Sequence, residues 1–242
     1  MTSRIRSTVP NLTALCLTSV VLCLASAAQA DSITVNMTVD NSYALFHGTS
    51  TTAQTFVGSD FNWTTTETYN FNLPSSDYLY VVTASDLSTA QGFLGQFKNN
   101  TFNYTFYSND PQWQVMATGL GSGAPYTGST ADMNLLSAQL VNANLGASGT
   151  TASLGWTALT AGPANGGGPW GTRPLINAAA RWVWYSSNGD PDPTTPGFNH
   201  DEWLVFRIRV GATPMVPEPG ALALLASAGL SGAGLFLRRR RK

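Results

Sequence analysis

Histidine is the side chain best suited to acid–base catalysis at neutral pH, and it occurs twice in the 242 residues. His47 lies in a turn-like segment and His200 in a loop rich in Asp and Pro, so both are predicted to be surface residues. The adjacent acids Asp201 and Glu202 would point to opposite faces of a strand and cannot form the carboxylate pair of a glycosidase. A pair from distant parts of the chain stays open as an alternative. These residues predict a noncatalytic protein.

The sequence also contains no motif that singles out a nucleophile or a phosphate-binding loop. Cys16 and Cys23 both lie in an N-terminal apolar segment that we expect to be removed, which leaves the mature chain without a thiol. Residues 166–171 match the glycine pattern of a dinucleotide-binding loop, but a proline and a tryptophan stand where the helix should begin. We interpret this segment as an ordinary loop.

Hard oxygen ligands gather in the region 188–202, an Asp- and Pro-rich segment. Carboxylates are the ligands that Ca²⁺ prefers, so a structural calcium ion is a candidate here. The alternative is a solvated turn in which Asp and Asn side chains cap the backbone. The candidate ligands are Asp190, Asp192 and Asp201.

Aromatic side chains in loop-like sequence are candidates for stacking on sugar rings, whose C–H faces pack against aromatic rings. We expect them to be more exposed than the tryptophans of the predicted strands, although burial in the core is the better interpretation for each. The candidates are Tyr126, Trp156 and Trp170.

The charges of the chain are distributed unevenly. Residues 31–213 hold five basic and 12 acidic side chains, a net charge of −7. Nucleic acid needs a basic surface, so this region is predicted not to bind it. Only 10% of the chain is charged, which indicates a surface of Thr, Ser, Asn, Gln and Gly.

The N-terminus has the three parts of a secretory signal peptide. Arg4 and Arg6 precede an apolar run from about residue 12 to residue 27, and small side chains follow at Ala28 and Ala30. We expect residues 1–30 to enter the Sec translocon and to be cleaved by signal peptidase after Ala30. The alternative is a retained membrane anchor.

The C-terminal tail, residues 214–242, also has three parts. A Pro-rich motif at 216–219 precedes an apolar stretch at 220–237, which is just long enough to cross a bilayer core of ~30 Å as a helix. The basic end should stay in the cytoplasm, which places the preceding domain outside. The motif residues are Val216, Pro217, Glu218 and Pro219, and the basic residues are Arg238, Arg239, Arg240, Arg241 and Lys242.

This tail closely resembles the PEP-CTERM sorting signal, in which a Pro-Glu-Pro motif, an apolar helix and an arginine cluster follow in this order. The resemblance covers about 27 residues at the extreme C-terminus. It implies processing near the motif by an exosortase of a Gram-negative bacterium that makes extracellular polysaccharide. The protein would pass through the inner membrane and end at the cell surface or in the matrix. The alternative is a permanent membrane anchor.

The region between the two targeting segments, residues 31–213, reads as one β-sandwich domain. Apolar and polar residues alternate at 33–39 and 69–73, and aromatic and β-branched residues fill later runs. About ten short strands predict an all-β antiparallel sandwich or jelly roll. We expect one helical turn near 132–140 and otherwise loops, with one or two irregular strands, across 119–171. The later runs are 78–84, 102–107, 113–117, 181–185 and 203–210.

This domain loosely resembles the galactose-binding-like jelly-roll modules that accompany many bacterial glycosidases. Residues 40–46 read Asp-Asn-Ser-Tyr-Ala-Leu-Phe, and Trp63 precedes Tyr-Asn-Phe-Asn-Leu at 69–73, in the order of that family. The chain departs from the family pattern at His47, where Asn is usual, and at Asp77. The resemblance implies a jelly-roll fold and, by analogy, binding of extracellular polysaccharide.

The sequence therefore predicts an exported surface or matrix protein with a noncatalytic adhesion or carbohydrate-binding domain. The alternatives are a secreted glycan-active hydrolase and a purely structural coat protein.

Overall fold

The computed structural model describes residues 30–85, 90–121, 128–146, 155–185, 194 and 202–210, which contain eleven strands and one helix. In chain order these elements are β1 (Ala30–Asp40), β2 (Ser42–Gly48), β3 (Ala53–Asp60), β4 (Glu67–Pro74), β5 (Tyr78–Ala84), β6 (Gly92–Asn99), β7 (Tyr104–Tyr107), β8 (Gln114–Gly121), α1 (Thr130–Asn144), β9 (Thr160–Ala164), β10 (Arg181–Trp184) and β11 (Glu202–Arg209).

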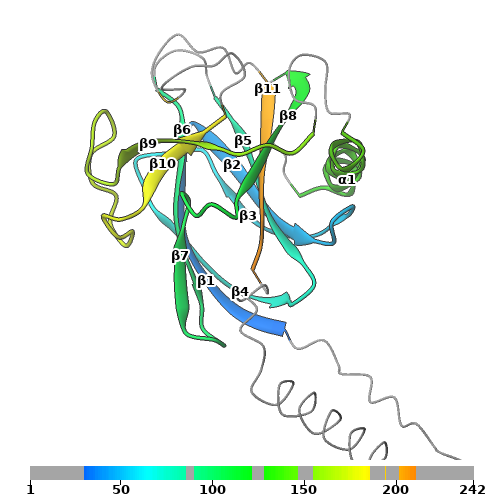
Figure 1. Cartoon of the computed structure of the whole chain (residues 1–242), viewed down its shortest axis with the longest axis horizontal. Coiled ribbons are helices and arrows are strands. Elements are labelled where there is room, and N and C mark those ends of the chain that lie inside the picture. Colours follow the sequence, from blue (N-terminus) through cyan, green and yellow to red (C-terminus); the bar gives the residue numbers. More distant parts are fainter. Residues whose placement is uncertain are drawn as a thin grey trace, which may run out of the picture.

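The strands form two antiparallel sheets that face each other (Figure 1). The six-stranded sheet has the order β4-β1-β6-β10-β9, with β7 also paired to β6, and the five-stranded sheet has the order β3-β2-β5-β11-β8. The prediction of an all-β antiparallel sandwich is thus confirmed. Among the described residues, no helix is long and apolar enough to span a membrane, and the predicted helix at 220–237 lies outside them.

Strand β1 shows how sequence alternation builds the sandwich. It pairs with β4 on one side and β6 on the other, and its apolar side chains Ile33, Val35 and Met37 are fully buried. Thr34 and Asn36 point to the other face, where Thr34 donates a hydrogen bond to Asn70 and Asn36 accepts one from Thr68. One face of this part of the sheet is therefore apolar, and the other is covered with hydroxyl and amide groups.

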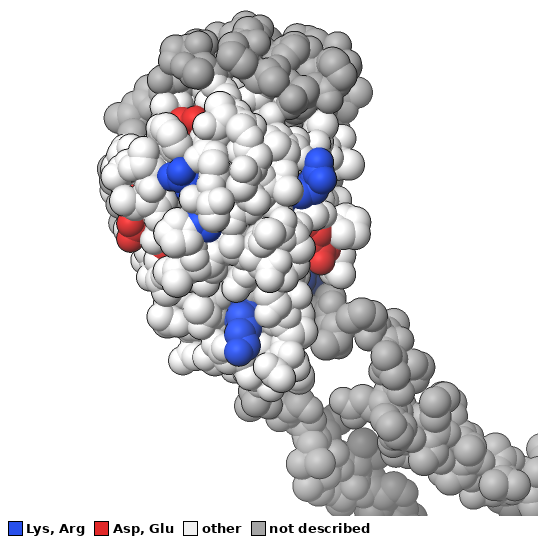
Figure 2. Space-filling view, turned by 90° about the vertical axis from the view of Figure 1, so that its left-hand side faces the viewer, with Lys and Arg blue, Asp and Glu red and all other residues white. Residues whose placement is uncertain are grey.

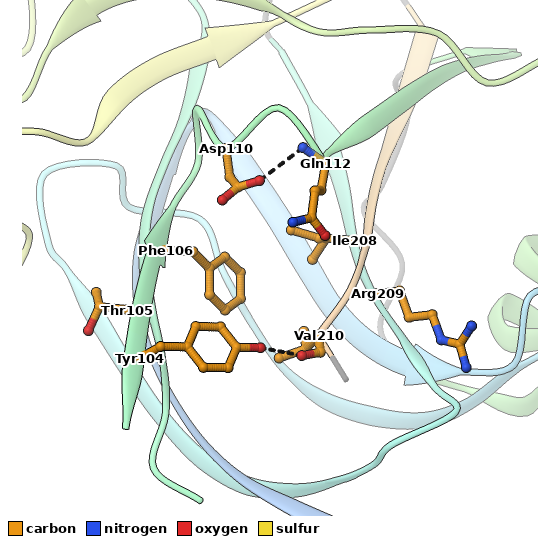
Figure 3. A pocket seen from close by; sticks show the side chains of 8 residues that line it. All are labelled: Tyr104, Thr105, Phe106, Asp110, Gln112, Ile208, Arg209 and Val210. Carbon is orange, nitrogen blue, oxygen red and sulfur yellow. Dashed lines mark hydrogen bonds between the residues drawn. The ribbon is translucent and has the colours of Figure 1, made fainter. Parts of the chain in front are cut away.

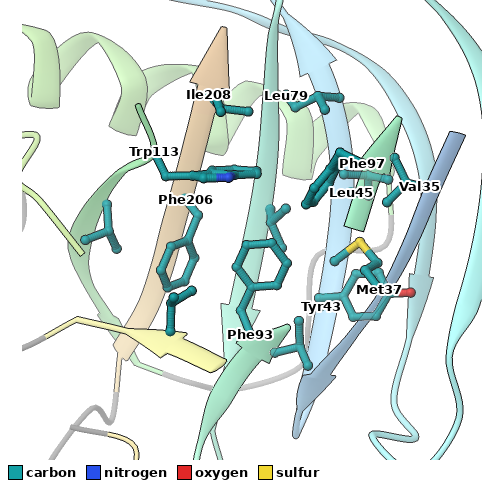
Figure 4. Packing of buried hydrophobic residues seen from close by; sticks show 14 of the residues in the cluster. Val35, Met37, Tyr43, Leu45, Leu79, Phe93, Phe97, Trp113, Phe206 and Ile208 are labelled. Carbon is teal, nitrogen blue, oxygen red and sulfur yellow. The ribbon is translucent and has the colours of Figure 1, made fainter. Parts of the chain in front are cut away.

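The core between the sheets is dominated by aromatic rings (Figure 4). Phe93 lies 5.4 Å from Trp113 and 5.4 Å from Phe206, measured between ring centroids, and Phe97 lies 5.2 Å from Trp113. These rings come from both sheets, and edge-to-face and tilted contacts such as these stabilise a core beyond area burial alone. A chain without cysteine after residue 30 is held together by this packing.

A helix covers the outer face of the five-stranded sheet, beside β3 and β8 (Figure 1). Residues 119–171 were expected to hold one helical turn, but α1 spans 15 residues. The Ser129 hydroxyl caps it by accepting a hydrogen bond from the Asp132 amide. Apolar residues lie on both its buried and exposed faces, so the helical periodicity is blurred in the sequence. The buried ones are Leu136, Leu140 and Ala143, and the exposed ones are Leu135, Val141 and Leu145.

Both ends of the domain lie at the same pole of the sandwich (Figure 1). Near the first residues, Asp31 accepts a hydrogen bond of 3.0 Å from the amide of Asn99. Asn99 is opposite Tyr104 in the β6–β7 register, and the Tyr104 hydroxyl donates to the carbonyl of Val210. A short chain of contacts thus ties the start of β1 to the end of β11.

Candidate ligand-binding pocket

A pocket of about 270 Å³ lies between β7 and the end of β11 (Figure 3). It exists because β8 is paired to β11 only as far as Gln114, which is opposite Arg207. Within the described part of the chain, the last residues of β11 therefore have no neighbouring strand on that side, and β7 pairs only with β6. The gap between the sheets stays open here, and the turn from Tyr107 to Trp113 closes its upper end.

The floor of the pocket is aromatic. The Phe106 ring stacks on Phe97 at 5.1 Å and lies 5.9 Å from the Tyr104 ring. Burial raises the pKa of the Tyr104 phenol, so its hydroxyl stays protonated and donates to Val210. Ile208 and Val210 complete the apolar part of the lining.

The polar groups of the pocket lie at its upper rim. One oxygen of Asp110 accepts a hydrogen bond of 2.9 Å from the Gln112 backbone amide, which fixes the turn. The second Asp110 oxygen and the Gln112 side-chain amide make no hydrogen bond to any other described residue. Arg209 and Thr105 also line the pocket, but in Figure 3 the Arg209 guanidinium points away from Phe106.

This arrangement suits a small hydroxylated ligand. An apolar ring face can pack on Tyr104 and Phe106 while hydroxyl groups bond to Asp110 and Gln112. Hydrolysis of a glycosidic bond normally needs two carboxyl groups, and Asp110 is the one carboxylate among the lining residues. The pocket can therefore bind and orient such a ligand, and its lining does not supply the acid–base pair.

Trp170 does not have the exposure that its loop-like sequence suggested. It is 3% exposed, its ring stacks on Trp182 at 4.1 Å, and its indole N–H donates to Asp40 at 2.7 Å. The segment around it folds back onto the outer face of the six-stranded sheet and forms a small second core. Trp170 is therefore corrected from a candidate sugar platform to a core residue.

Trp156 is half-buried and already has a partner on one face. The Arg207 guanidinium lies 3.7 Å from its ring centroid, and Asn144 accepts hydrogen bonds from both the Trp156 indole and Arg207. Burial lowers the pKa of Arg207, and no carboxylate of the described residues forms an ion pair with it. This cluster joins the C-terminal end of α1 to β11, which is a structural use of Trp156.

His47 was expected at the surface, but the structure buries it. Its side chain is 10% exposed, its Nδ1 lies 2.9 Å from the Asp77 carboxylate, and its ring stacks on Phe71 at 5.9 Å. The pairing of β2 with β5 places Gly48 opposite Tyr78, which brings His47 and Asp77 together. His47 and Asp77 are 30 residues apart in the sequence, so neither local segment predicts their contact.

Several predicted site residues lie outside the described residues. These are Ala28, Tyr126, Asp190, Asp192, Asp201 and the whole tail with its motif and arginines. Within the described part of the chain, no three His, Cys, Asp or Glu side chains lie close enough to hold a metal ion. Ala30 is the exposed first residue of β1, opposite Pro74.

The pocket residues were not among the predicted site residues. Residues 102–107 were predicted as a strand, and the structure places β7 there, but strand prediction does not show where a partner strand ends. The one local signal was Asp110-Pro111, a turn dipeptide beside aromatic residues. No family model, no curated protein and no solved structure matches this chain.

Proposed function

We propose that this is an exported surface or extracellular-matrix protein of a Gram-negative bacterium, sorted through a PEP-CTERM tail by an exosortase. Its sandwich, in this proposal a jelly roll of the galactose-binding-like type, binds carbohydrate without catalysis. The pocket between β7 and β11 carries the binding part of the proposal, because it combines an aromatic floor with polar groups that lack a hydrogen-bond partner among the described residues. The sequence of the tail carries the sorting part.

The positions of the domain ends support attachment through a single point. Asp31 would be the first residue after signal cleavage, and Val210 precedes the tail by a few residues. Both lie at one pole, so a tail held in the membrane would leave the opposite pole facing outward. The pocket opens beside the strand that leads into the tail.

The charge distribution supports a neutral polar partner rather than nucleic acid. Figure 2 shows a few basic and acidic side chains on a face that is mostly uncharged. Residues 31–213 carry a net charge of −7, which would repel a phosphate backbone. An uncharged polysaccharide would not be repelled by this net charge.

The sorting part is tested by intact mass spectrometry of the protein recovered from membrane, surface and medium of its native host. We expect the surface form to lack residues 1–30 and the segment after about Pro219. A surface form that keeps the apolar helix and the arginines would show an ordinary anchored ectodomain and would refute processing by an exosortase.

The binding part is tested with the mature domain on glycan arrays that include the host's own extracellular polysaccharide. We expect retention of at least one glycan, and we expect Gln112→Ala to weaken it by about tenfold, the loss of one well-placed hydrogen bond. Asp110→Asn should weaken it while the turn, which needs one oxygen acceptor, is kept.

The matched control is Gln54→Ala, since Gln54 is an exposed glutamine on β3, outside the pocket lining. It should leave retention unchanged. Absence of retention on every glycan, or equal retention by the Gln112 and Gln54 variants, would remove the proposed site.

A further inference from the structure

The segment that joins β3 to β4 contains the acceptor pattern for N-linked glycans, Asn62-Trp63-Thr64. An Asn-x-Ser/Thr sequence is a modification site only where the asparagine is accessible in an exported protein. Residues 31–213 contain four such asparagines. They are Asn36, Asn62, Asn99 and Asn103.

Two of the four asparagines use their side-chain amides in hydrogen bonds within the folded domain. The side-chain amide of Asn99 is fully buried and donates to Asp31 at 3.0 Å. The amide of Asn36 donates to the Leu175 carbonyl at 3.2 Å, and the hydroxyl residue of its pattern, Thr38, is also fully buried. A glycosyltransferase cannot reach either site without unfolding β1 or β6.

Asn62 is exposed, and its geometry favours reaction at the amide nitrogen. Its Oδ1 accepts hydrogen bonds from the Thr64 hydroxyl at 2.6 Å and from the Thr64 backbone amide at 3.2 Å. Two donors on Oδ1 draw electron density toward oxygen, which makes the Nδ2 protons more acidic. Nδ2 itself has no partner among the described residues. Asn103 is exposed too, but no hydrogen bond from Thr105 reaches its side chain.

The segment around Asn62 is held firmly against the domain. Arg173 donates to the Thr64 carbonyl at 2.8 Å, and its guanidinium lies 5.3 Å from the Trp63 ring. Thr38 donates to the Trp63 carbonyl at 3.0 Å, and Asp60 accepts from the Asn62 backbone amide at 3.1 Å. Trp63 therefore faces inward while Asn62 is presented to solvent.

We propose that Asn62 is N-glycosylated after export, with a lipid-diphosphate-linked oligosaccharide as the donor. In this transfer Nδ2 of Asn62 attacks the anomeric carbon of the donor sugar and a C–N bond forms. The bond from that carbon to the diphosphate oxygen breaks, the lipid diphosphate leaves with the electron pair, and Nδ2 loses one proton to a base of the transferase. No group is oxidised or reduced.

A glycan at this position would protect the open side of the sandwich. β3 and β4 each lie at one edge of a sheet, and Asn62 lies in the segment that connects them. Exposed strand edges invite pairing with other chains, and natural proteins cover or blunt them. A bulky hydrophilic chain beside both edges would hinder such pairing.

The test is mass spectrometry of proteolytic peptides from protein recovered from its native host. We expect an added saccharide mass on the peptide that contains Asn62, lost in Asn62→Gln and Thr64→Ala but kept in Thr64→Ser, which preserves the hydroxyl. Asn103→Gln, the matched exposed control, should leave the added mass in place. An unmodified Asn62 peptide, or a saccharide on Asn103 instead, would overturn the proposal.

The inference rests on export, which the proposed function includes, and the same spectra separate the two. A processed N-terminus at Asp31 with an unmodified Asn62 would refute glycosylation and leave export standing. Protein found only in the cytoplasm, with residues 1–30 still attached, would refute both.

Discussion

Replacement of Trp170 with alanine is expected to lower the free energy of unfolding by about 3–5 kcal/mol, the usual cost of truncating a buried tryptophan. The indole is 3% exposed and stacks on Trp182 at 4.1 Å, so its removal leaves a cavity under the 165–180 segment. It also leaves the Asp40 carboxylate without the indole N–H that lies 2.7 Å from it. Urea denaturation of the mature domain measures the change from the shift in midpoint at constant slope.

The control is Phe61→Ala, because Phe61 is 59% exposed and lies two residues before Trp63, which packs against the same cluster as Trp170. Surface substitutions of this kind usually change stability by less than about 0.5 kcal/mol. A loss below about 1 kcal/mol for the Trp170 variant, together with a loss of glycan retention, would instead restore Trp170 as a binding residue.

The parts of the fold that could be predicted are those encoded locally. Alternation in residues 33–39 is enough to define a strand with one apolar face, and β1 has this pattern. The continuous apolar run at 78–84 became β5, a strand in the middle of the five-stranded sheet. The spacing of apolar residues and the types of residue present are enough to predict such strands without knowledge of any tertiary contact.

Trp170 shows what local sequence does not encode. Three glycines and a proline precede it, which is typical of an exposed loop. The strand β10, however, buries Trp182 on one face and Val183 in the core on the other, so the outer face of that sheet also needs a cover. The segment that carries Trp170 supplies this cover. The burial of Trp170 can be predicted only when both faces of β10 are known to be apolar.

The pocket is hidden from sequence for a different reason. Its side chains come from β7, from the following turn and from the end of β11, about 100 residues later. Tyr104 and Gln112 line one pocket with Val210 because β8 pairs with β11 only as far as Gln114 while β11 continues. Strand register is set by long-range packing, so no pattern within either segment predicts the gap.

Alkaline unfolding is the second large effect that the structure predicts. Tyr43 and Tyr80 are fully buried, and burial raises the pKa of both phenols above the usual value of about 10. The Tyr43 hydroxyl shares a hydrogen bond of 2.9 Å with Tyr69, and the Tyr80 hydroxyl donates to the Thr49 carbonyl. In the folded protein these groups stay protonated, whereas in the unfolded chain they ionise near pH 10.

The stability that these two tyrosines contribute is therefore fully present below about pH 10 and is lost as the pH rises above it. Each contributes a slope of up to about 1.4 kcal/mol per pH unit, so the two together should lower the free energy of unfolding by up to about 2.7 kcal/mol per unit in this range. Tyr69 and Tyr104, whose pKa values burial also raises, add to this slope. Urea midpoints measured from pH 9 to pH 12 give the slope directly. Tyr43→Phe keeps the ring but removes the ionisable group, so it should be less stable at pH 8 yet have an alkaline slope that is smaller by up to about 1.4 kcal/mol per pH unit. An unchanged slope in this variant would mean that the Tyr43 phenol is not shielded from solvent, which would contradict its place in the core between the two sheets.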